Sequence, residues 1–404
     1  MHDLTVLFVD GDAQLLKSLK RLIASRQPNW KARFAQDGKE ALRTLHEQAC
    51  DVIISDADLN AMSGSALLDQ VTEHWPMTLR ILLTDQMDQK SISSLLKSAH
   101  QLLSKPCPLN QLVDAVECAI SLRTLYMNET VRGILHRMAQ LPVVPRIYME
   151  LTQELRKDDC APNALGAIIA RDMGLTAGIL KLVNSPFFGL SRRMDSPQQA
   201  VSFLGVDILK GLVIYESVFK TLDPAHYPDF DVERLWMHSL DEARCCKAIA
   251  KAEGMRGQDL DSAFSAGLLH DIGKIVLAEG CPEEYVRVLR KSQSENRPLA
   301  ESEIALLGIT HAEVGAYLLG LWGFPEPVVV AIAHHHDPSR DEHPSILTAI
   351  LHGADVLMHD RYVRQSGHSR HNLDQAYLDR NGWGDRPEQW RARVDLELDA
   401  DIGE

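Results

Sequence analysis

The sequence lacks the features that would place this chain in a membrane or outside the cell. Its 404 residues contain no apolar run near the roughly 18 residues that a membrane-spanning helix needs. The first residues, MHDLTVLFVDGD, reach acidic side chains too early for a secretory signal. There are only seven cysteines and no CxxC pair, so a disulfide framework is not expected. We therefore expect a cytoplasmic protein that does not bind membranes.

Clusters of basic residues are also missing. The chain has 42 Lys and Arg against 56 Asp and Glu, which gives a formal net charge of −14. Such a surface repels a nucleic-acid backbone, so direct nucleic-acid binding is not expected. Histidine is abundant instead: there are 17, and they concentrate in the second half, several at spacings that a metal would use.

A chain of this length exceeds what one hydrophobic core usually organises, so at least two domains are expected. The first 122 residues alternate short apolar runs with stretches of helical periodicity. The runs are TVLFV (5–9), WKARF (30–34), DVIIS (51–55), RILLT (80–84) and QLLS (101–104). Strands rich in Val, Ile and Leu, each followed by an amphipathic segment, are typical of βα units with a buried parallel sheet. We predict a doubly wound α/β domain with five parallel strands over residues 1–122.

Polar residues fall at the ends of these predicted strands. Asp10 and Asp12 follow the first strand, Asp56 follows the third, Thr84 ends the fourth and Lys105 follows the fifth. In such a sheet, ligands bind at the carboxyl ends of the strands. Carboxylates brought together there repel each other unless a hard cation such as Mg²⁺ lies between them, and a lysine and a hydroxyl can then hold a phosphoryl group. The pattern predicts an aspartyl-phosphate site.

Residues 4–122 resemble a response-regulator receiver domain through VLFVDGD, DVIISD, ILLT and SKP, in that order. The resemblance implies that a histidine kinase or phosphotransfer protein phosphorylates Asp56. It also implies that Asp10 and Asp56 bind Mg²⁺, that Thr84 is the switch hydroxyl and that Lys105 contacts the phosphate.

The sequence departs from the receiver pattern in several places. Gly11 replaces the second of two adjacent acids, which weakens the Mg²⁺ site; Asp12 is expected to point elsewhere, and Asp58 to restore negative charge near the metal. Asp85 stands where a small residue normally admits the phosphoryl group. Asn60 and Leu102 replace a usual proline and a usual aromatic residue. The alternative interpretation is a receiver fold that no longer accepts phosphate and serves as a docking module.

After Pro108 the apolar residues recur at intervals of three and four up to residue 140, which predicts one long helix or two nearly continuous ones. Residues 123–140 would form a connecting helix that transmits movement between domains. The apolar stripe could pair with a second copy, giving a homodimer, or pack on the second domain.

Residues 141–363 read as helices, among them ALGAIIARD, LTAGILKLVN, DSAFSAGLLHDIGK and AEVGAYLLGLW, so we predict an all-α domain. Ordered phrases resemble the HDOD family, an output module related to the HD phosphohydrolases: LPVVP, IIARDMGLTAGILKLVNSPFFG, GLLHDIGK, ITHAEVGAYLLGLWGFP and AIAHHHDP. NSPFFG is interpreted as structural, with Asn184 capping a turn. The resemblance implies regulatory output in bacterial signalling, through contacts with a downstream signalling protein.

The resemblance to HD phosphohydrolases also implies a metal centre. The matching positions are His238, His270, Asp271, His311, His335, His336 and Asp355. Imidazole and carboxylate ligands suit Fe, Mn or Zn, and Lys274 is a candidate phosphate contact. The alternative function is therefore a receiver-gated, metal-dependent phosphohydrolase or phosphodiesterase. Hydrolysis of cyclic di-GMP is not expected, because the GYP signature is missing after HHHDP. A further alternative is that these residues form a hydrogen-bonded network that only joins helices.

Residues 364–404 are polar and end in acids. We expect a solvated, partly frayed tail with a short helix around Pro387–Leu398, which Trp383 and Trp390 could attach to the body.

Overall fold

The computed structural model describes residues 4–121 except 28, 61, 86–94 and 96–97; residues 147, 150, 151 and 154; and residues 161–183, 194–219, 232–366 except 342, and 372–399. These residues divide into two compact units, the first formed chiefly by residues 1–143 and the second chiefly by residues 144–404. Among the described residues, no helix combines the length and the apolar character needed to cross a lipid bilayer. Each unit is described by itself.

The first unit contains a five-stranded parallel sheet with the strand order β2-β1-β3-β4-β5. The strands are β1 (Leu4–Val9), β2 (Trp30–Ala35), β3 (Val52–Asp56), β4 (Leu79–Thr84) and β5 (Gln101–Ser104). Every residue of β3 and β4 is buried, which explains why these strands read as continuous apolar runs rather than alternating ones. The predicted doubly wound five-stranded fold is confirmed.

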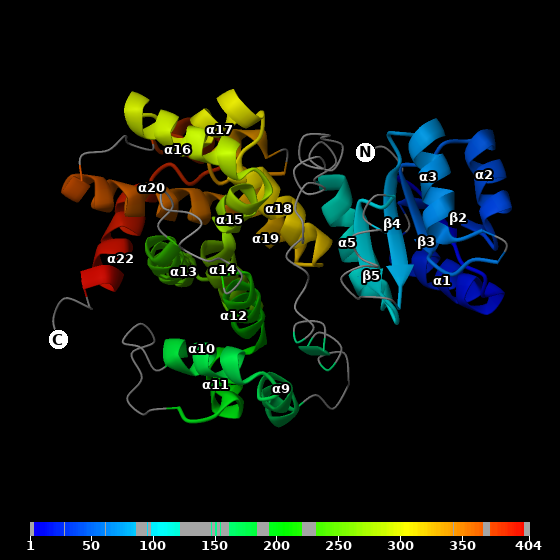
Figure 1. The fold of residues 1–404 in the computed structure, drawn as a ribbon, viewed down its shortest axis with the longest axis horizontal. Coiled ribbons are helices and arrows are strands. Elements are labelled where there is room, and N and C mark those ends of the chain that lie inside the picture. The colour runs from blue at the N-terminus through cyan, green and yellow to red at the C-terminus, as the bar shows by residue number, and fades with distance from the viewer. Residues whose placement is uncertain are drawn as a thin grey trace. The chain divides into compact units, whose positions relative to one another are not determined.

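Helices cover both faces of this sheet (Figure 1). They are α1 (Ala13–Arg26), α2 (Gly38–Glu47), α3 (Gly64–His74) and α5 (Leu109–Ser121). Leu7, Ile53 and Leu82 belong to one core cluster with Leu45 of α2 and Leu67 of α3. This packing fixes the carboxyl ends of β1, β3 and β4 beside one another.

The second unit is helical throughout its described part, as predicted. Its elements are α9 (Pro162–Ile169), α10 (Met173–Val183), α11 (Pro197–Leu204), α12 (Val206–Phe219), α13 (Val232–Ala252), α14 (Gln258–Leu269), α15 (Ile272–Gly280), α16 (Pro282–Glu295), α17 (Leu299–Leu307), α18 (His311–Leu321), α19 (Glu326–His334), the 3-10 helix η3 (Pro338–Arg340), α20 (Ile346–Ser366), α21 (Gln375–Arg380) and α22 (Pro387–Asp399). Figure 1 shows α9, α10 and α11 gathered at one end, and α12 connects them to α14. The long helix α13 packs against α14, α20 and α22.

The stretch DSAFSAGLLHDIGK is not the single helix that its periodicity predicts. Helix α14 ends at Leu269 and α15 begins at Ile272, and Asp271 between them has φ −98° and ψ 6°. This sparsely populated backbone region redirects the chain. The break places His270 and Asp271 at the junction of two helices, inside the unit, where both are almost fully buried.

The polar C-terminal segment packs on the helical unit, so the expectation of a solvated tail is wrong for residues 372–399. Helix α22 contacts α13 and α20. Trp390 is fully buried, and its indole N–H donates to Glu253 Oε1 at 2.9 Å. The expected short helix is confirmed as α22, whereas α21 was not predicted.

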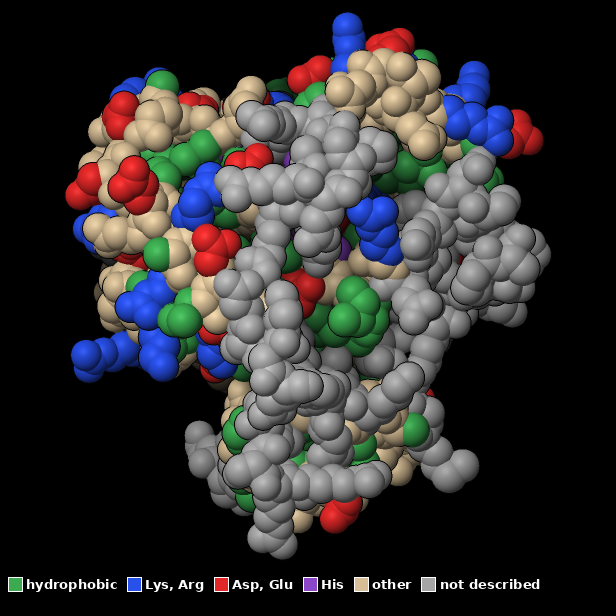
Figure 2. Space-filling model, turned by 90° about the vertical axis from the view of Figure 1, so that its left-hand side faces the viewer, with side chains coloured by type: hydrophobic (Ala, Val, Ile, Leu, Met, Phe, Trp, Pro, Cys, Tyr) green, Lys and Arg blue, Asp and Glu red, His purple; other side chains and the backbone are tan. Residues whose placement is uncertain are grey.

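Charged side chains occupy the outside. Figure 2 shows Lys and Arg interspersed with Asp and Glu over the described part of one face, where very little histidine colour is visible. Three predicted features lie outside the described residues: the connecting helix at 123–140 with its dimer stripe, LPVVP at 141–145, and NSPFFG at 184–189.

Candidate functional site

The first unit carries an acidic site at the carboxyl end of its sheet. Asp10 follows β1, Asp56 ends β3 and Thr84 ends β4, and all three side chains are buried or nearly so. Lys105, directly after β5, places its Nζ 2.7 Å from Asp56 Oδ2 and 3.4 Å from Asp10 Oδ2. Burial opposes the charge of this lysine, but the hydrogen bond to Asp56 and the charge of Asp10 raise the pKa of Lys105. The residues predicted from strand ends therefore do meet at one edge.

The two carboxylates are held in the same way. Asp10 Oδ1 accepts a hydrogen bond from the backbone N–H of Asp12 at 2.8 Å, and Asp56 Oδ1 accepts one from the N–H of Asp58 at 3.2 Å. Each carboxylate thus presents its other oxygen, Oδ2, to the same cation, Lys105. Two converging carboxylate oxygens are the kind of ligand that Mg²⁺ prefers, so these residues fit the ion.

The neighbouring acids have other positions. Asp12 is the N-cap of α1, and its Oδ1 accepts hydrogen bonds from the backbone N–H groups of Gln14 and Leu15. Its carboxylate is therefore directed to the helix start, as expected when Gly11 breaks the acid pair. Asp58 and Asp85 are exposed. Their predicted roles in the Mg²⁺ site and the phosphate entry stay predictions.

The second unit brings all seven predicted metal-ligand candidates together from five segments. His238 comes from α13, His270 and Asp271 from the junction of α14 and α15, His311 from the first residue of α18, His335 and His336 from the turn after α19, and Asp355 from α20. Three groups among the described residues have ligand atoms within 4.8 Å of one another: His311, His335 and His336; His238, His270 and Asp355; His270, Asp271 and His335. The first two groups share no residue, and the third group shares His335 with the first and His270 with the second.

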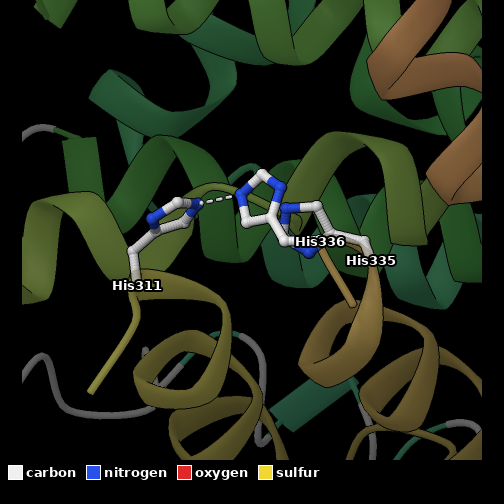
Figure 3. Close-up of side chains that lie close together, drawn as sticks. All are labelled: His311, His335 and His336. Atoms are coloured by element: carbon white, nitrogen blue, oxygen red, sulfur yellow. Dashed lines mark hydrogen bonds between the residues drawn. The ribbon is translucent and has the colours of Figure 1, made fainter. Parts of the chain in front are cut away.

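Figure 3 shows how the first group lies: the rings of His335 and His336 face His311 from the end of α19. His311 Nε2 and His336 Nε2 are 2.9 Å apart. The rings of His335 and His336 have their centroids 3.9 Å apart. The 2.9 Å between the two Nε2 atoms is a hydrogen-bond distance, so one of these nitrogens donates to the other.

Asp271 lies among the other ligand candidates. Its Oδ1 is 3.1 Å from His311 Nε2, and its Oδ2 is 3.3 Å from His270 Nε2. Lys274 Nζ lies 2.6 Å from the same Oδ2. Burial opposes the charge of this lysine, but the Asp271 carboxylate raises the pKa of Lys274. In this structure Lys274 thus compensates the charge of Asp271, and its predicted contact with a phosphate stays a prediction.

Two histidines direct their Nε2 atoms at the centre, and that of His270 lies 3.3 Å from Asp271 Oδ2. Nδ1 of His270 donates to the backbone oxygen of Gly267, and Nδ1 of His335 donates to that of Ile332, both at 2.7 Å. Among the described residues, neither Nε2 atom has a hydrogen-bond partner, although both are buried. A ring held through Nδ1 with its Nε2 bare and pointing inward is the arrangement of a metal-ligating histidine.

The ionisation of His335 and His238 agrees with that function, whereas His311, whose pKa the Glu303 carboxylate raises to about 9 against the effect of burial, would have to lose a proton to bind a metal through Nε2. Burial, reinforced by the nearby His270, lowers the pKa of His335 to about 3. The same two causes lower the pKa of His238 to about 4. Both imidazoles are therefore neutral near pH 7, which is the form that binds a metal. Imidazole nitrogens with carboxylate oxygens suit Fe, Mn or Zn, so the residues present fit such an ion.

The structure adds one residue that the sequence did not indicate. Glu303 of α17 is fully buried, and its Oε2 accepts hydrogen bonds from the backbone N–H of His311 at 2.9 Å and from His311 Nδ1 at 2.7 Å. The hydroxyl of Tyr285 donates to Glu303 Oε1 at 3.3 Å. Glu303 thus fixes the orientation of His311, as outer-shell carboxylates do at metal sites. No ligand spacing in the sequence marks it, because it acts through another side chain.

Comparison with known proteins agrees with both predicted domains. Residues 6–117 match the response regulator receiver domain, and residues 141–338 match the HDOD domain. An HDOD domain protein of unknown function from Geobacter sulfurreducens has a crystal structure with a TM-score of 0.52 and 25% identity, over 68% of this chain and 94% of that one.

Two curated relatives match parts of the chain. An uncharacterized protein of Treponema pallidum is 28% identical over 205 residues, which is 51% of this chain and 39% of that protein. The DNA-binding transcriptional regulator NtrC of Escherichia coli is 32% identical over 117 residues, 29% of this chain and 24% of NtrC. The chain thus spans well under half the length of either relative. The matches to the two domain families, together with the acidic sheet edge and the histidine-rich helical centre, identify the chain as a response regulator receiver domain joined to an HDOD domain.

Proposed function

We propose that the chain is a cytoplasmic response regulator whose receiver domain is phosphorylated at Asp56 by a histidine kinase or a phosphotransfer protein. The observation that carries the proposal is the pair of ion contacts from Lys105 to Asp56 and Asp10. A phosphoryl group on Asp56 would place negative charge beyond the carboxylate. Lys105 and Thr84 offer a cation and a hydroxyl to that group at the same edge of the sheet. Asp10 and Asp56 would hold Mg²⁺, which would supply charge neutralisation for the transfer.

The output would be a change in how the HDOD domain contacts a downstream signalling protein. An aspartyl phosphate favours one of two receiver conformations. The HDOD domain responds to that shift only if the contacts it makes differ between the two receiver conformations. A homodimer formed through residues 123–140 is one way to carry the change.

Incubation with acetyl phosphate and Mg²⁺, followed by intact-protein mass spectrometry, tests the phosphoacceptor. Wild type should gain one phosphoryl group, and Asp56→Asn should gain none. Asp37→Asn is the matched control, because Asp37 is an acid following β2 that caps α2, a role asparagine can also fill. Equal labelling of wild type and Asp56→Asn would remove Asp56 from the proposal.

The second candidate is a metal-dependent phosphohydrolase. It is favoured by the buried Nε2 atoms of His270 and His335, which have no hydrogen-bond partner among the described residues. A divalent ion bound there supplies a Lewis acid for phosphoester hydrolysis. The chain's own residues would hold the ion, orient its ligands through Glu303, and balance the charge of Asp271 through Lys274.

Elemental analysis of protein purified without chelator, together with a screen of cyclic dinucleotides and generic phosphodiesters, separates the two candidates. His335→Ala should lose the ion. His334→Ala is the matched control, because His334 neighbours His335 but belongs to none of the three ligand groups. Turnover that disappears with His335→Ala and survives His334→Ala supports the enzyme. A metal-free, inactive protein that still binds its partner supports the regulatory module alone.

A further inference from the structure

The two histidines after α19 need support from outside their own helix. Helix α19 ends at His334. The backbone carbonyl groups of its last turn and of the following residues therefore cannot accept hydrogen bonds from the N–H groups of a further helical turn. His335 and His336 lie in this turn, and both are ligand candidates. Whatever holds the peptide between them therefore sets the position of two ligands at once.

His352 of α20 provides that support. Its side chain is 3% exposed, and its Nδ1 lies 2.7 Å from the backbone oxygen of His335. Its Nε2 lies 2.9 Å from the backbone nitrogen of Asp374. A carbonyl oxygen only accepts and a backbone N–H only donates, so Nδ1 must carry the proton and Nε2 must accept. The two contacts define one neutral tautomer of His352.

The second of these contacts comes from the C-terminal segment, beyond the residues 141–338 that match the HDOD domain. Asp374 caps α21 and accepts a 2.6 Å hydrogen bond from Ser339, which lies in η3 after the histidine turn. Trp390 of α22 packs on Gly353, where an added Cβ would lie 2.6 Å from the indole. Both C-terminal helices thus hold the part of α20 that carries His352 and Asp355.

We propose that His352 is a positioning residue for the metal centre and that the C-terminal segment sets its tautomer through the backbone N–H of Asp374. This inference rests on the second proposed function, a bound metal. The C-terminal segment is then a structural part of the centre, although it supplies none of the candidate ligands. A change that releases the segment would loosen His335 and weaken metal binding without touching a ligand.

Competition between the protein and a chelator for Co²⁺ tests the role of His352. His352→Leu fills the space without a donor and should bind Co²⁺ 10- to 100-fold more weakly, which is about the loss seen when outer-shell partners are removed. His352→Asn places an N–H donor at the position of Nδ1 and should recover most of the affinity and the visible absorption spectrum of bound Co²⁺. Thermal unfolding of the chelator-treated proteins shows whether each variant is folded. An unchanged affinity in His352→Leu, or equal losses in both variants, overturns the inference.

A second pair of variants isolates the backbone N–H. Asp374 has φ −77°, which proline can adopt, so Asp374→Pro removes the N–H and places the ring Cδ against His352 Nε2, where the hydrogen bond was. Asp374→Ala loses the same carboxylate but keeps the N–H. We expect Asp374→Pro to bind Co²⁺ several-fold more weakly than Asp374→Ala, and equal affinities overturn the role of the segment. Wild type that binds no Co²⁺ overturns the metal centre itself and the inference with it, whereas wild-type binding with no difference within either pair overturns the inference alone.

Discussion

Replacing Gly273 by alanine should damage both the stability and the metal centre of the helical unit. Gly273 lies in the first turn of α15, where α15 crosses α18. An added Cβ would lie 1.9 Å from the backbone oxygen of His311 and 2.7 Å from the backbone nitrogen of Gly315. These atoms belong to a helix backbone and cannot rotate away. The glycine of HDIGK is therefore required by the close approach of two helices.

The size of the effect follows from these distances. Ordinary van der Waals contact of a Cβ begins near 3.4 Å, so the two helices would have to separate by more than an ångström. Overpacking of this kind costs roughly 1–3 kcal/mol, and a clash with backbone belongs at the upper end of that range. For a unit of this size, about 3 kcal/mol lowers Tm by roughly 6–12 °C. The same separation would lengthen the 3.1 Å distance between Asp271 Oδ1 and His311 Nε2.

Calorimetric unfolding and Co²⁺ competition should both detect the change. Gly211→Ala is the matched control, because Gly211 also lies in a buried helix but its Cβ would meet its nearest neighbours at 3.4 and 3.5 Å. That variant should be neutral or more stable by up to about 1 kcal/mol. If Gly273→Ala unfolds within about 2 °C of wild type and binds Co²⁺ equally well, the close approach does not limit the centre.

Three further predictions follow from buried side chains. Trp390→Ala should destabilise the helical unit by about 3–5 kcal/mol in urea unfolding, because the ring is fully buried. Trp383→Ala, at a partly exposed position, should lower the free energy of unfolding much less. Equal losses in the two variants would contradict the packing of α22. Burial disfavours a charged His311, but the Glu303 carboxylate raises its pKa to about 9. The stabilisation from this pair is therefore complete below pH 6.5 and is lost as the pH rises to about 9. The urea midpoint of metal-free wild type should fall over that pH window relative to the midpoint of Glu303→Gln. Parallel curves of midpoint against pH for the two proteins would refute the pairing. Burial raises the pKa of the Cys50 thiol to about 12, so Cys50→Ser should leave the number of thiols that react with Ellman's reagent at pH 8 unchanged, and a loss of one thiol would show that Cys50 is accessible.

The sequence predicted the receiver fold well because each of its signals is local. A buried parallel strand must be apolar on both faces, so DVIIS and RILLT are visible as runs, and each predicted strand end lies within one residue of the end in the structure. The acids at the strand ends then meet because the topology brings carboxyl ends to one edge. Nothing in that prediction depends on contacts between distant side chains.

The histidine centre shows where local signals end. Its seven candidate ligands could be found because each lies in a recognisable phrase, but the residues that orient them could not. Glu303 acts through His311, and His352 acts through the carbonyl of His335, so neither contacts the place where an ion would lie. The same holds for the C-terminal segment, whose polar composition indicates a tail, although the fully buried Trp390 against Gly353 and the contacts of Asp374 attach it to the unit. A ligand is recognisable from its residue type and spacing, whereas its support depends on backbone atoms that any residue provides, and only the folded chain identifies which ones.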